Sequence, residues 1–175
     1  MITIRPYRDD DREVVVKLWW ESWHSIRPGL RHPRPFEELR ARWEREIVPR
    51  QRIAVAAEAG VVVGFAAADL AEGELTQIFV APDRKGQGIG HRLFEWTQAT
   101  MPEGFILHTL VDNVTSRAFY ERHGLVAGAS RVNPANGMTV IEYRWSPPTP
   151  VADLDTPGRR SLESKDEASS AKEAL

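Results

Sequence analysis

The spacing of apolar and polar residues predicts one α/β domain. Alternating or continuous apolar runs indicate seven strands, and apolar positions at helical spacing indicate four helices. The order is a strand, two helices, three strands, a helix, a strand, a helix and two strands, which predicts a mixed sheet with helices on its faces. The better-marked ranges are strands at about 2–5, 74–80, 105–111, 126–132 and 139–145, and helices at about 36–47, 88–100 and 114–123.

The first two helices carry large apolar side chains. The second has apolar residues at helical spacing through 36–47, and Pro49 ends the pattern. In the first, the segment WWESW places Trp19 and Trp23 on one helix face, because residues four apart are neighbours on a helix surface. This favours core positions for both over a ligand platform, and it leaves Trp20 on another face.

The composition changes near the C-terminus. The chain has 175 residues with 42% apolar content, which is enough for one globular domain with its own core. From Pro147 onward there is no aromatic residue, and proline, serine, alanine and acidic residues dominate. Such a segment cannot bury enough apolar surface to offset the entropy lost on ordering. We therefore predict a domain over residues 1–146 and a disordered tail over 147–175.

The charge balance argues against two classes of partner. The tail holds four of the 23 Lys and Arg residues and six of the 25 Asp and Glu residues, which leaves 19 of each sign in residues 1–146. A neutral domain has no electrostatic footprint for nucleic acid or an anionic membrane, so neither is expected as a partner.

The residues that the chain lacks exclude several kinds of site and indicate where the protein is located. There is no cysteine, which excludes disulfides, thiolate metal sites and a cysteine nucleophile. The N-terminal segment has charges where a signal peptide needs apolar residues, and no run approaches the length of a membrane span. A cytoplasmic location is predicted.

Three alternating glycines follow the strand predicted at 74–80 and open a helix. Their spacing, G-x-G-x-G, differs from the G-x-G-x-x-G of dinucleotide-binding folds, because His91 stands in place of the last glycine. A Walker loop is excluded as well, since no G-K-[ST] closes the motif. What both cradles share is present: unhindered amides at the positive end of a helix dipole, which favour a phosphate group. These amides belong to Gly86, Gln87, Gly88 and Ile89.

Two motifs carry a resemblance to a known family. The stretch from Val80 to Gly90, VAPDRKGQGIG, resembles the pyrophosphate loop of the GNAT N-acetyltransferases, and VDNVTSRAFYERHGL, residues 111–125, resembles a later motif of that family. The resemblance covers about residues 2–146 and implies a mixed, mostly antiparallel sheet of about seven strands flanked by about four helices. One departure is Lys85, where the family commonly has Arg or Gln. Because the loop binds mainly through backbone amides, we expect only a modest loss of affinity.

The resemblance implies acetyl-CoA as the acyl donor. The glycine loop would hold its diphosphate, and pantetheine would lie where the strands at 74–80 and 105–111 part, using backbone groups near Val80 as a strand would. Asn113 would bond the pantetheine arm. The residues expected at the cofactor are Phe79, Val80, Lys85, Gly86, Gln87, Gly88, Ile89, Gly90, Asn113 and Phe119.

Direct attack of an amine on the thioester suits a chain without cysteine or a G-x-S-x-G motif. The attacking amine must lose a proton and the departing thiolate must gain one. The resemblance places Tyr120 beside the sulfur, and a phenol with an ordinary pKa of about 10 keeps its proton at neutral pH. We assign Tyr120 as the general acid; the alternative is a packing role.

Glu74 is the candidate base, because family members often carry Glu or His on this strand. Regular alternation would place Glu74 on one strand face with Thr76, Ile78 and Val80. The alternative is a solvated carboxylate at the beginning of the strand.

The acceptor is expected to be the amine of a small molecule or peptide. The carboxylates Asp69, Glu72 and Glu74 would favour cationic amines if they face the acceptor entrance, or would simply face solvent. None of the five histidines has metal-ligand spacing, so no metal is expected, and only His24 sits where the family's acceptor loop runs. The sequence does not decide whether the chain forms a homodimer. The alternative function is a noncatalytic acyl-CoA-binding or regulatory module, which could lose Tyr120 without losing the cofactor.

Overall fold

The computed structural model describes residues 1–134 and 136–148, and in this range it forms a seven-stranded sheet with four α-helices. The strands are β1 (Ile2–Pro6), β2 (Arg52–Glu58), β3 (Val61–Asp69), β4 (Glu74–Val80), β5 (Phe105–Leu110), β6 (Val126–Val132) and β7 (Thr139–Trp145). The helices are α1 (Arg12–His24), α2 (Phe36–Arg42), α3 (Ile89–Thr100) and α4 (Val114–Arg122). The strand order is β1-β2-β3-β4-β5-β7-β6, with β4 and β5 parallel and the other pairs antiparallel. The predicted element order and fold class are confirmed.

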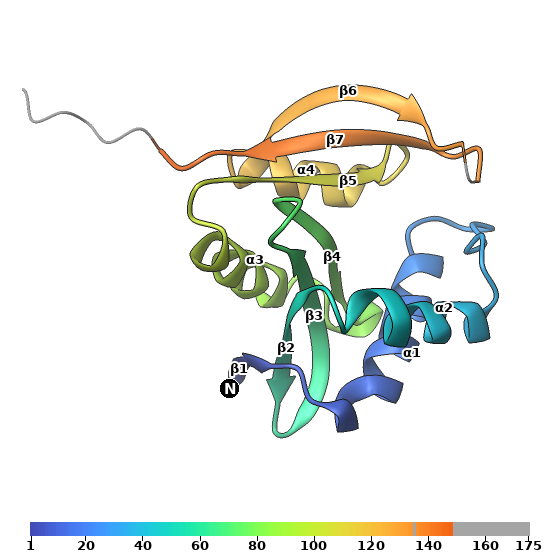
Figure 1. Ribbon diagram of the computed structural model, residues 1–175, viewed down its shortest axis with the longest axis vertical. Coiled ribbons are helices and arrows are strands. Elements are labelled where there is room, and N and C mark those ends of the chain that lie inside the picture. The colour runs from blue at the N-terminus through green and yellow to red at the C-terminus, as the bar shows by residue number, and fades with distance from the viewer. Residues whose placement is uncertain (135, 149–175) are drawn as a thin grey trace, which may run out of the picture.

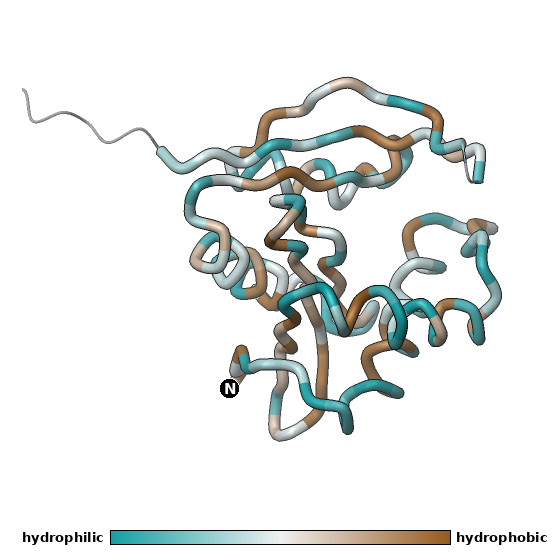
Figure 2. Tube along the Cα trace, in the orientation of Figure 1, coloured by the Kyte–Doolittle hydropathy of each residue, from teal (hydrophilic) through white to brown (hydrophobic). Residues whose placement is uncertain are grey.

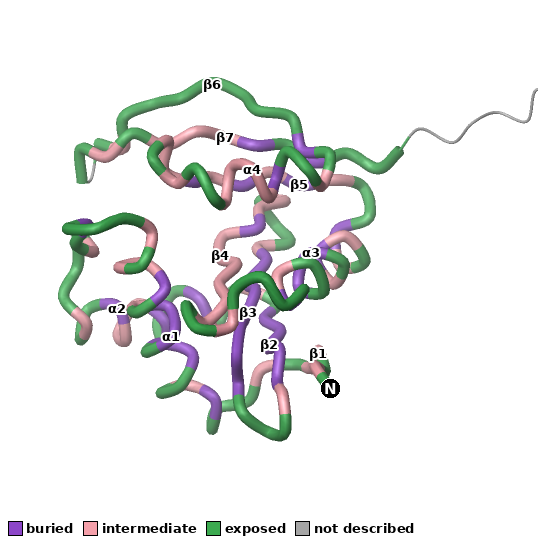
Figure 3. The backbone as a smooth tube through the Cα atoms, turned by 180° about the vertical axis from the view of Figure 1, so that it is seen from behind, coloured by how far each residue is buried: buried purple, intermediate pink, exposed green. Residues whose placement is uncertain are grey.

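Strands β2 and β3 form the buried centre of the sheet. Their sequences, RIAVAAE and VVVGFAAAD, are nearly continuous apolar runs, as expected for strands covered on both faces. Figure 3 shows both as largely buried, whereas the edge strand β6 is exposed along its length. Figure 2 shows the same division in hydropathy, with hydrophobic residues following β3.

Helices cover both faces of the sheet, and each face has its own core. α1 and α2 pack on one face, where Trp19, Trp43 and Phe65 meet edge to face. α3 and α4 lie on the other face, where Phe94 meets Phe119. We call these the α1 face and the α3 face; Figure 1 shows α1 and α3 on opposite sides of the central strands. The helix predicted over 36–47 is confirmed, and its last turn, Trp43–Ile47, widens into a π-helical turn.

Strand β4 contains a β-bulge at Thr76. Ala67 of β3 pairs with Gln77, and the next residue, Ala68, pairs with Leu75, so Thr76 has no partner residue in β3. Its hydroxyl lies 3.1 Å from the Ala67 carbonyl oxygen and donates to it. The extra residue shifts the alternation of side chains along β4 by one position.

The bulge decides which face Glu74 occupies. After the bulge, Ile78 and Val80 pack on the α3 face and Phe79 on the α1 face. Before the bulge, Glu74 pairs with Asp69. Asp69 directly follows Ala68, which packs on the α3 face, and successive side chains of a strand point to opposite faces. Asp69 and its partner Glu74 therefore belong to the α1 face. The alternation that grouped Glu74 with Ile78 and Val80 is therefore wrong, because it assumed a strand without a bulge.

Strands β4 and β5 begin side by side and then part. Among the described residues they pair at one position, Glu74 with Ile106, and the Ile106 amide donates to the Gly73 carbonyl oxygen at 3.0 Å. Beyond that point β5, β7 and β6 pass across the end of the remaining sheet (Figure 1). The expected gap between the strands at 74–80 and 105–111 is confirmed.

The predicted tail lies almost wholly outside the described residues. Its disorder, and the domain limit at residue 146, stay predictions. Within 1–134 and 136–148, no helix combines the length and the apolar character that crossing a bilayer requires.

Candidate active site

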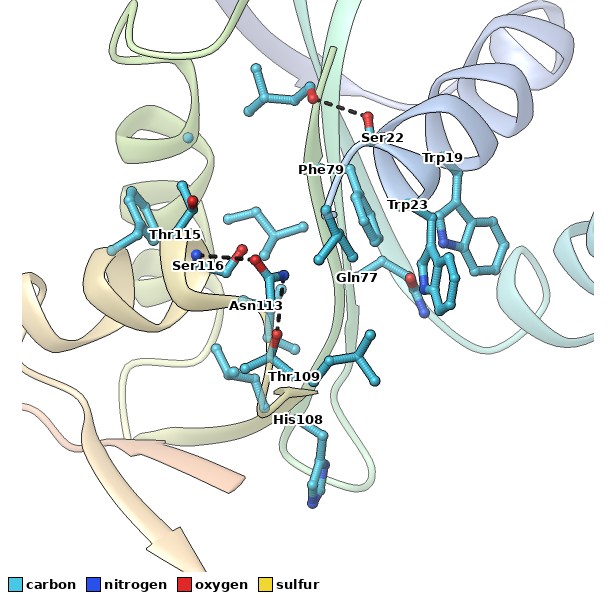
Figure 4. Close-up of a pocket in the computed structure, with 18 of the residues that line it drawn as sticks. Trp19, Ser22, Trp23, Gln77, Phe79, His108, Thr109, Asn113, Thr115 and Ser116 are labelled. Carbon is cyan, nitrogen blue, oxygen red and sulfur yellow. Dashed lines mark hydrogen bonds between the residues drawn. The ribbon is translucent and has the colours of Figure 1, made fainter. Parts of the chain in front are cut away.

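The parted strands open a cleft of about 1020 Å³. Figure 4 shows Thr109 and Asn113 at one wall, and Trp23, Gln77 and Phe79 at the other. The cleft brings together most of the residues predicted from the sequence, namely Phe79, Val80, Lys85, Gly86, Gly88, Ile89, Gly90, Asn113, Phe119 and Tyr120. Two predicted residues, Gln87 and Glu74, do not line it.

The glycine loop has the conformation that a phosphate cradle needs. Gly86 and Gly88 both have φ of +78°, a left-handed backbone that other residues adopt only with strain. A Cβ at either position would meet no atom within 4 Å, so the space in front of the loop is open. Gly88 caps the N-terminus of α3, whose dipole favours an anion there. The loop therefore fits the diphosphate of a CoA thioester.

Gly90 has a different role in the same loop. A Cβ here would lie 3.5 Å from the ring of Phe119, in ordinary van der Waals contact. The second motif thus packs directly on the first, which holds α3 and α4 together at the cleft.

The two cations before the glycines point in different directions. Arg84 forms an ion pair with Glu58 of β2. The Lys85 ammonium donates to the Ser25 hydroxyl at 2.9 Å, just after α1. Lys85 therefore bridges the glycine loop to the α1 face and lines the cleft, as its place in the motif predicted.

The end of β4 is fastened to α1 through Ser22. This buried hydroxyl donates to the Val80 carbonyl oxygen at 3.0 Å. Pantetheine was expected to use backbone groups near Val80. The Ser22 bond occupies one of the two lone pairs of this carbonyl oxygen, and the other can still accept a hydrogen bond.

Asn113 is the N-cap of α4. Its side-chain oxygen accepts from the Ser116 amide at 3.3 Å, and its side-chain nitrogen lies 3.4 Å from the Thr109 hydroxyl oxygen. Both distances are long for hydrogen bonds, so the amide group has a defined place in the cleft wall but weak partners.

Tyr120 is buried at the cleft from the α3 face. It belongs to the same core cluster as Leu75 and Leu107. These two leucines directly follow Glu74 and Ile106, the pair that joins β4 to β5. Burial raises the pKa of the Tyr120 phenol, and a hydrogen bond with Ser116 opposes this in part. The hydroxyl therefore keeps its proton well above neutral pH, as a general acid requires.

Glu74 lies beside a histidine that the sequence reasoning set aside. Its carboxylate is 3.0 Å from Nδ1 of His108 on β5. His108 lines the cleft, whereas Glu74 sits behind it. No motif marked His108, because the two residues come together only through the pairing of two strands.

The α1-face wall of the cleft is aromatic. Trp23 and His32 meet with ring centroids 4.8 Å apart. Phe79 and Gln77 of β4 belong to the same wall as Trp23. Burial lowers the pKa of His32, which keeps its ring neutral at physiological pH. Trp19 is a core residue, as its helix face favoured, but Trp23 is half-buried at the cleft, because the opening cuts into the α1 face there.

Asp69, Glu72 and His24, near the predicted acceptor region, contact other parts of the chain instead of the cleft. Asp69 accepts from the amides of Ala71 and Glu72 and so closes the turn before β4. Glu72 lines a separate hollow, so these two carboxylates do not gather at the cleft. His24 binds the Trp20 carbonyl oxygen at 2.7 Å and lies outside the cleft lining.

Within the described residues, no group of three or more His, Asp or Glu side chains is arranged to hold a metal ion.

Comparison with known proteins agrees with this site. The chain matches the model of the acetyltransferase (GNAT) family over residues 13–125, which include both motifs. Its fold is similar to PaiA N-acetyltransferase from Thermoplasma acidophilum in complex with coenzyme A, with a TM-score of 0.68 at 17% identity over 83% of this chain and 99% of that one. It is also similar to YncA from Salmonella typhimurium with its cofactor acetyl-CoA, with a TM-score of 0.64 at 16% identity over 89% and 99%. At these identities the likeness shows the fold alone. A search of curated proteins finds no significant match.

Proposed function

The chain belongs to the GNAT acetyltransferase family, and from this premise we propose that it transfers an acetyl group from acetyl-CoA to a primary amine. The acceptor is a small molecule or a peptide. The amine attacks the thioester directly, without a covalent enzyme intermediate.

One observation carries the proposal: the gap that opens between β4 and β5 directly after the pair Glu74 and Ile106. The glycine loop follows the far end of β4, and Tyr120 lies in the core cluster beside the closed end. A ligand with phosphates at one end and a thioester at the end of a thin arm fits this layout. The strand edges left unpaired by the gap supply backbone groups to the arm.

Tyr120 and Glu74 serve the two proton transfers from opposite faces of the sheet. Tyr120 approaches the gap from the α3 face and gives its proton to the departing thiolate. Glu74 belongs to the α1 face and supplies negative charge where the amine must lose a proton. The proton donor and this carboxylate therefore lie on opposite faces of the sheet.

The acceptor enters from the α1 face. Trp23, Phe79 and Gln77 form its wall, so an amine with an apolar or aromatic tail would bury surface there while Gln77 offers a hydrogen bond. Asp69 and Glu72 lie away from the cleft, so they do not draw cationic amines into it as predicted.

A panel of primary amines with neutral, cationic, acidic and aromatic tails tests the proposal. The purified full-length chain is mixed with acetyl-CoA, free CoA is measured, and each acetylated product is identified by mass spectrometry. We expect release of CoA that depends on the amine, with one product per CoA. Binding of acetyl-CoA without turnover for any amine would instead support the noncatalytic module.

A further inference from the structure

We propose that His108 is the group that takes the proton from the acceptor amine, and that Glu74 positions it. This inference rests on the proposed N-acetyltransferase function and identifies its base. It assigns the catalytic contact to a residue of β5 and gives the carboxylate of β4 a supporting role.

The backbone places His108 on the acceptor side of the cleft. Side chains alternate along β5, so His108 shares a face with Ile106 and Leu110, opposite to the core residue Leu107. Ile106 pairs with Glu74, which the bulge in β4 turns to the α1 face. The two polar side chains therefore meet on the face from which the amine arrives, next to the point where the strands part.

Their positions relative to the cleft distinguish the two partners. Both side chains are partly buried, at 21% and 30% exposed, but His108 forms part of the cleft wall and Glu74 does not. A substrate in the cleft would therefore reach the imidazole first. Figure 4 shows His108 at the end of the cleft, beyond Thr109.

The contacts of His108 fix its neutral tautomer. The Glu74 carboxylate can only accept, so Nδ1, 3.0 Å away, carries the proton of the neutral ring and donates to it. The lone pair is then on Nε2, and a guanidinium nitrogen of Arg131 lies 3.5 Å from this nitrogen. The contact at Nε2 is long and weak, so its lone pair remains available to an incoming amine.

Charged side chains lie on both sides of His108. Glu74 lies on one side, and a carboxylate oxygen of Glu142 on β7 lies 3.7 Å from Nε2 on the other. A guanidinium nitrogen of Arg131 lies near the same ring nitrogen, and Arg144 forms an ion pair of 3.2 Å with Glu142. Two carboxylates and two guanidiniums therefore surround the ring.

The proton balance is complete without any further reactant. The substrate ammonium gives one proton to Nε2 of His108, and the freed amine nitrogen attacks the thioester carbonyl carbon. The C–S bond breaks, and the thiolate takes the proton of Tyr120. The second proton on the former amine nitrogen returns to Tyr120 through water, and His108 releases its proton to solvent. One ammonium and one thioester become one amide, one thiol and one proton.

The test compares His108→Gln and Glu74→Gln with the wild-type chain, using an amine that the wild-type chain acetylates. We expect His108→Gln to lower kcat/KM by about 10² to 10⁴-fold at neutral pH and to remove the fall in rate on the acid side. Glu74→Gln should lower kcat/KM less, because the amide oxygen can still accept from Nδ1 of His108 but carries no negative charge. Glu72→Gln, an exposed carboxylate two residues away and outside the cleft, is the matched control and should behave as wild type.

Two readouts separate catalysis from folding. Calorimetric binding of acetyl-CoA should be unchanged in both variants, and long-range ¹H–¹⁵N NMR spectra of the wild-type chain should show the Nδ1–H tautomer of His108. A wild-type rate and pH profile in His108→Gln, or a larger loss in Glu74→Gln than in His108→Gln, would overturn the proposal and leave the acetyltransferase function intact. A wild-type chain that acetylates no amine would contradict both.

Discussion

At the scale of single residues, the phenol of Tyr120 bears most directly on the chemistry. Burial raises its pKa, so its ionisation should not limit the rate below about pH 10. Tyr120→Phe keeps the ring in the core but removes the proton, and we expect kcat to fall roughly ten- to a thousandfold with little change in acetyl-CoA affinity. Tyr143→Phe is the control, because this buried hydroxyl bonds Glu121 and Arg117 and lies outside the cleft lining. Equal rates in Tyr120→Phe and the wild-type chain, where chemistry limits turnover, would return Tyr120 to a packing role.

At the scale of elements, the glycine loop makes a prediction with a closely matched control. Gly88→Val forces a branched side chain into φ of +78° and into the open space that the diphosphate needs, so acetyl-CoA binding should be lost. Gly60→Val, in the turn between β2 and β3, imposes similar strain at φ of +84° and also meets no atom within 4 Å. Calorimetry should show binding in the folded Gly60 variant and none in the folded Gly88 variant. Unchanged binding in Gly88→Val would remove the loop from the cofactor site.

A second prediction at this scale concerns the joint between β1 and α1. Asp11 is nearly buried and accepts from both terminal nitrogens of Arg5 at 2.7 Å and from the Arg8 amide at 2.9 Å. These hydrogen bonds lower the pKa of Asp11, and those from Arg5 have the largest effect. Because the folded pKa is depressed, the stabilisation is complete above the unfolded value of about 3.9 and is lost as pH falls through the folded value.

We expect Asp11→Asn to lower the free energy of unfolding at pH 7 by about 1.5–3 kcal/mol, the range for hydrogen bonds to charged groups. The difference from the wild-type chain should shrink as pH falls below about 4. Asp10→Asn, at an exposed neighbouring position, is the control. Denaturant titrations at several pH values measure this, and a difference independent of pH would contradict the role given to the Asp11 charge.

The elements also show what sequence could predict and why. The element order was predicted because apolar spacing along β2 to β4 and in the helices is a local property. The loop was predicted because Gly86 and Gly88 adopt a backbone that few other residues tolerate. The bulge at Thr76 was not predicted, since it depends on the register between β3 and β4, and the face of Glu74 was wrong for that reason.

The same limit explains His108. Its partner Glu74 is 34 residues away, and only the pairing of β4 with β5 brings them together. The link from Lys85 to Ser25 is likewise a contact between elements far apart in the chain. Contacts of this kind leave no periodic or local signal in the sequence.

At the scale of the whole molecule, we predict that the residues after 148 are dispensable for chemistry. Both cores, the glycine loop and the cleft are formed within residues 1–148. A chain ending at Pro148 should therefore keep the thermal midpoint and the kcat/KM of the full chain, within about twofold for the latter. Thermal unfolding and steady-state rates measure this. A truncated chain that folds but loses turnover would place part of the active site beyond the domain.

The most direct test on the whole molecule asks whether the cleft transfers an acetyl group straight from acetyl-CoA to an amine. The wild-type chain is mixed in a single turnover with acetyl-CoA radiolabelled in the acetyl group and with an amine found in the panel. We predict that the label passes to the amine nitrogen, that one free CoA appears per product, and that no label is held covalently by the protein at any time. Label held covalently by the protein before the product forms, or CoA released equally without amine, would contradict it.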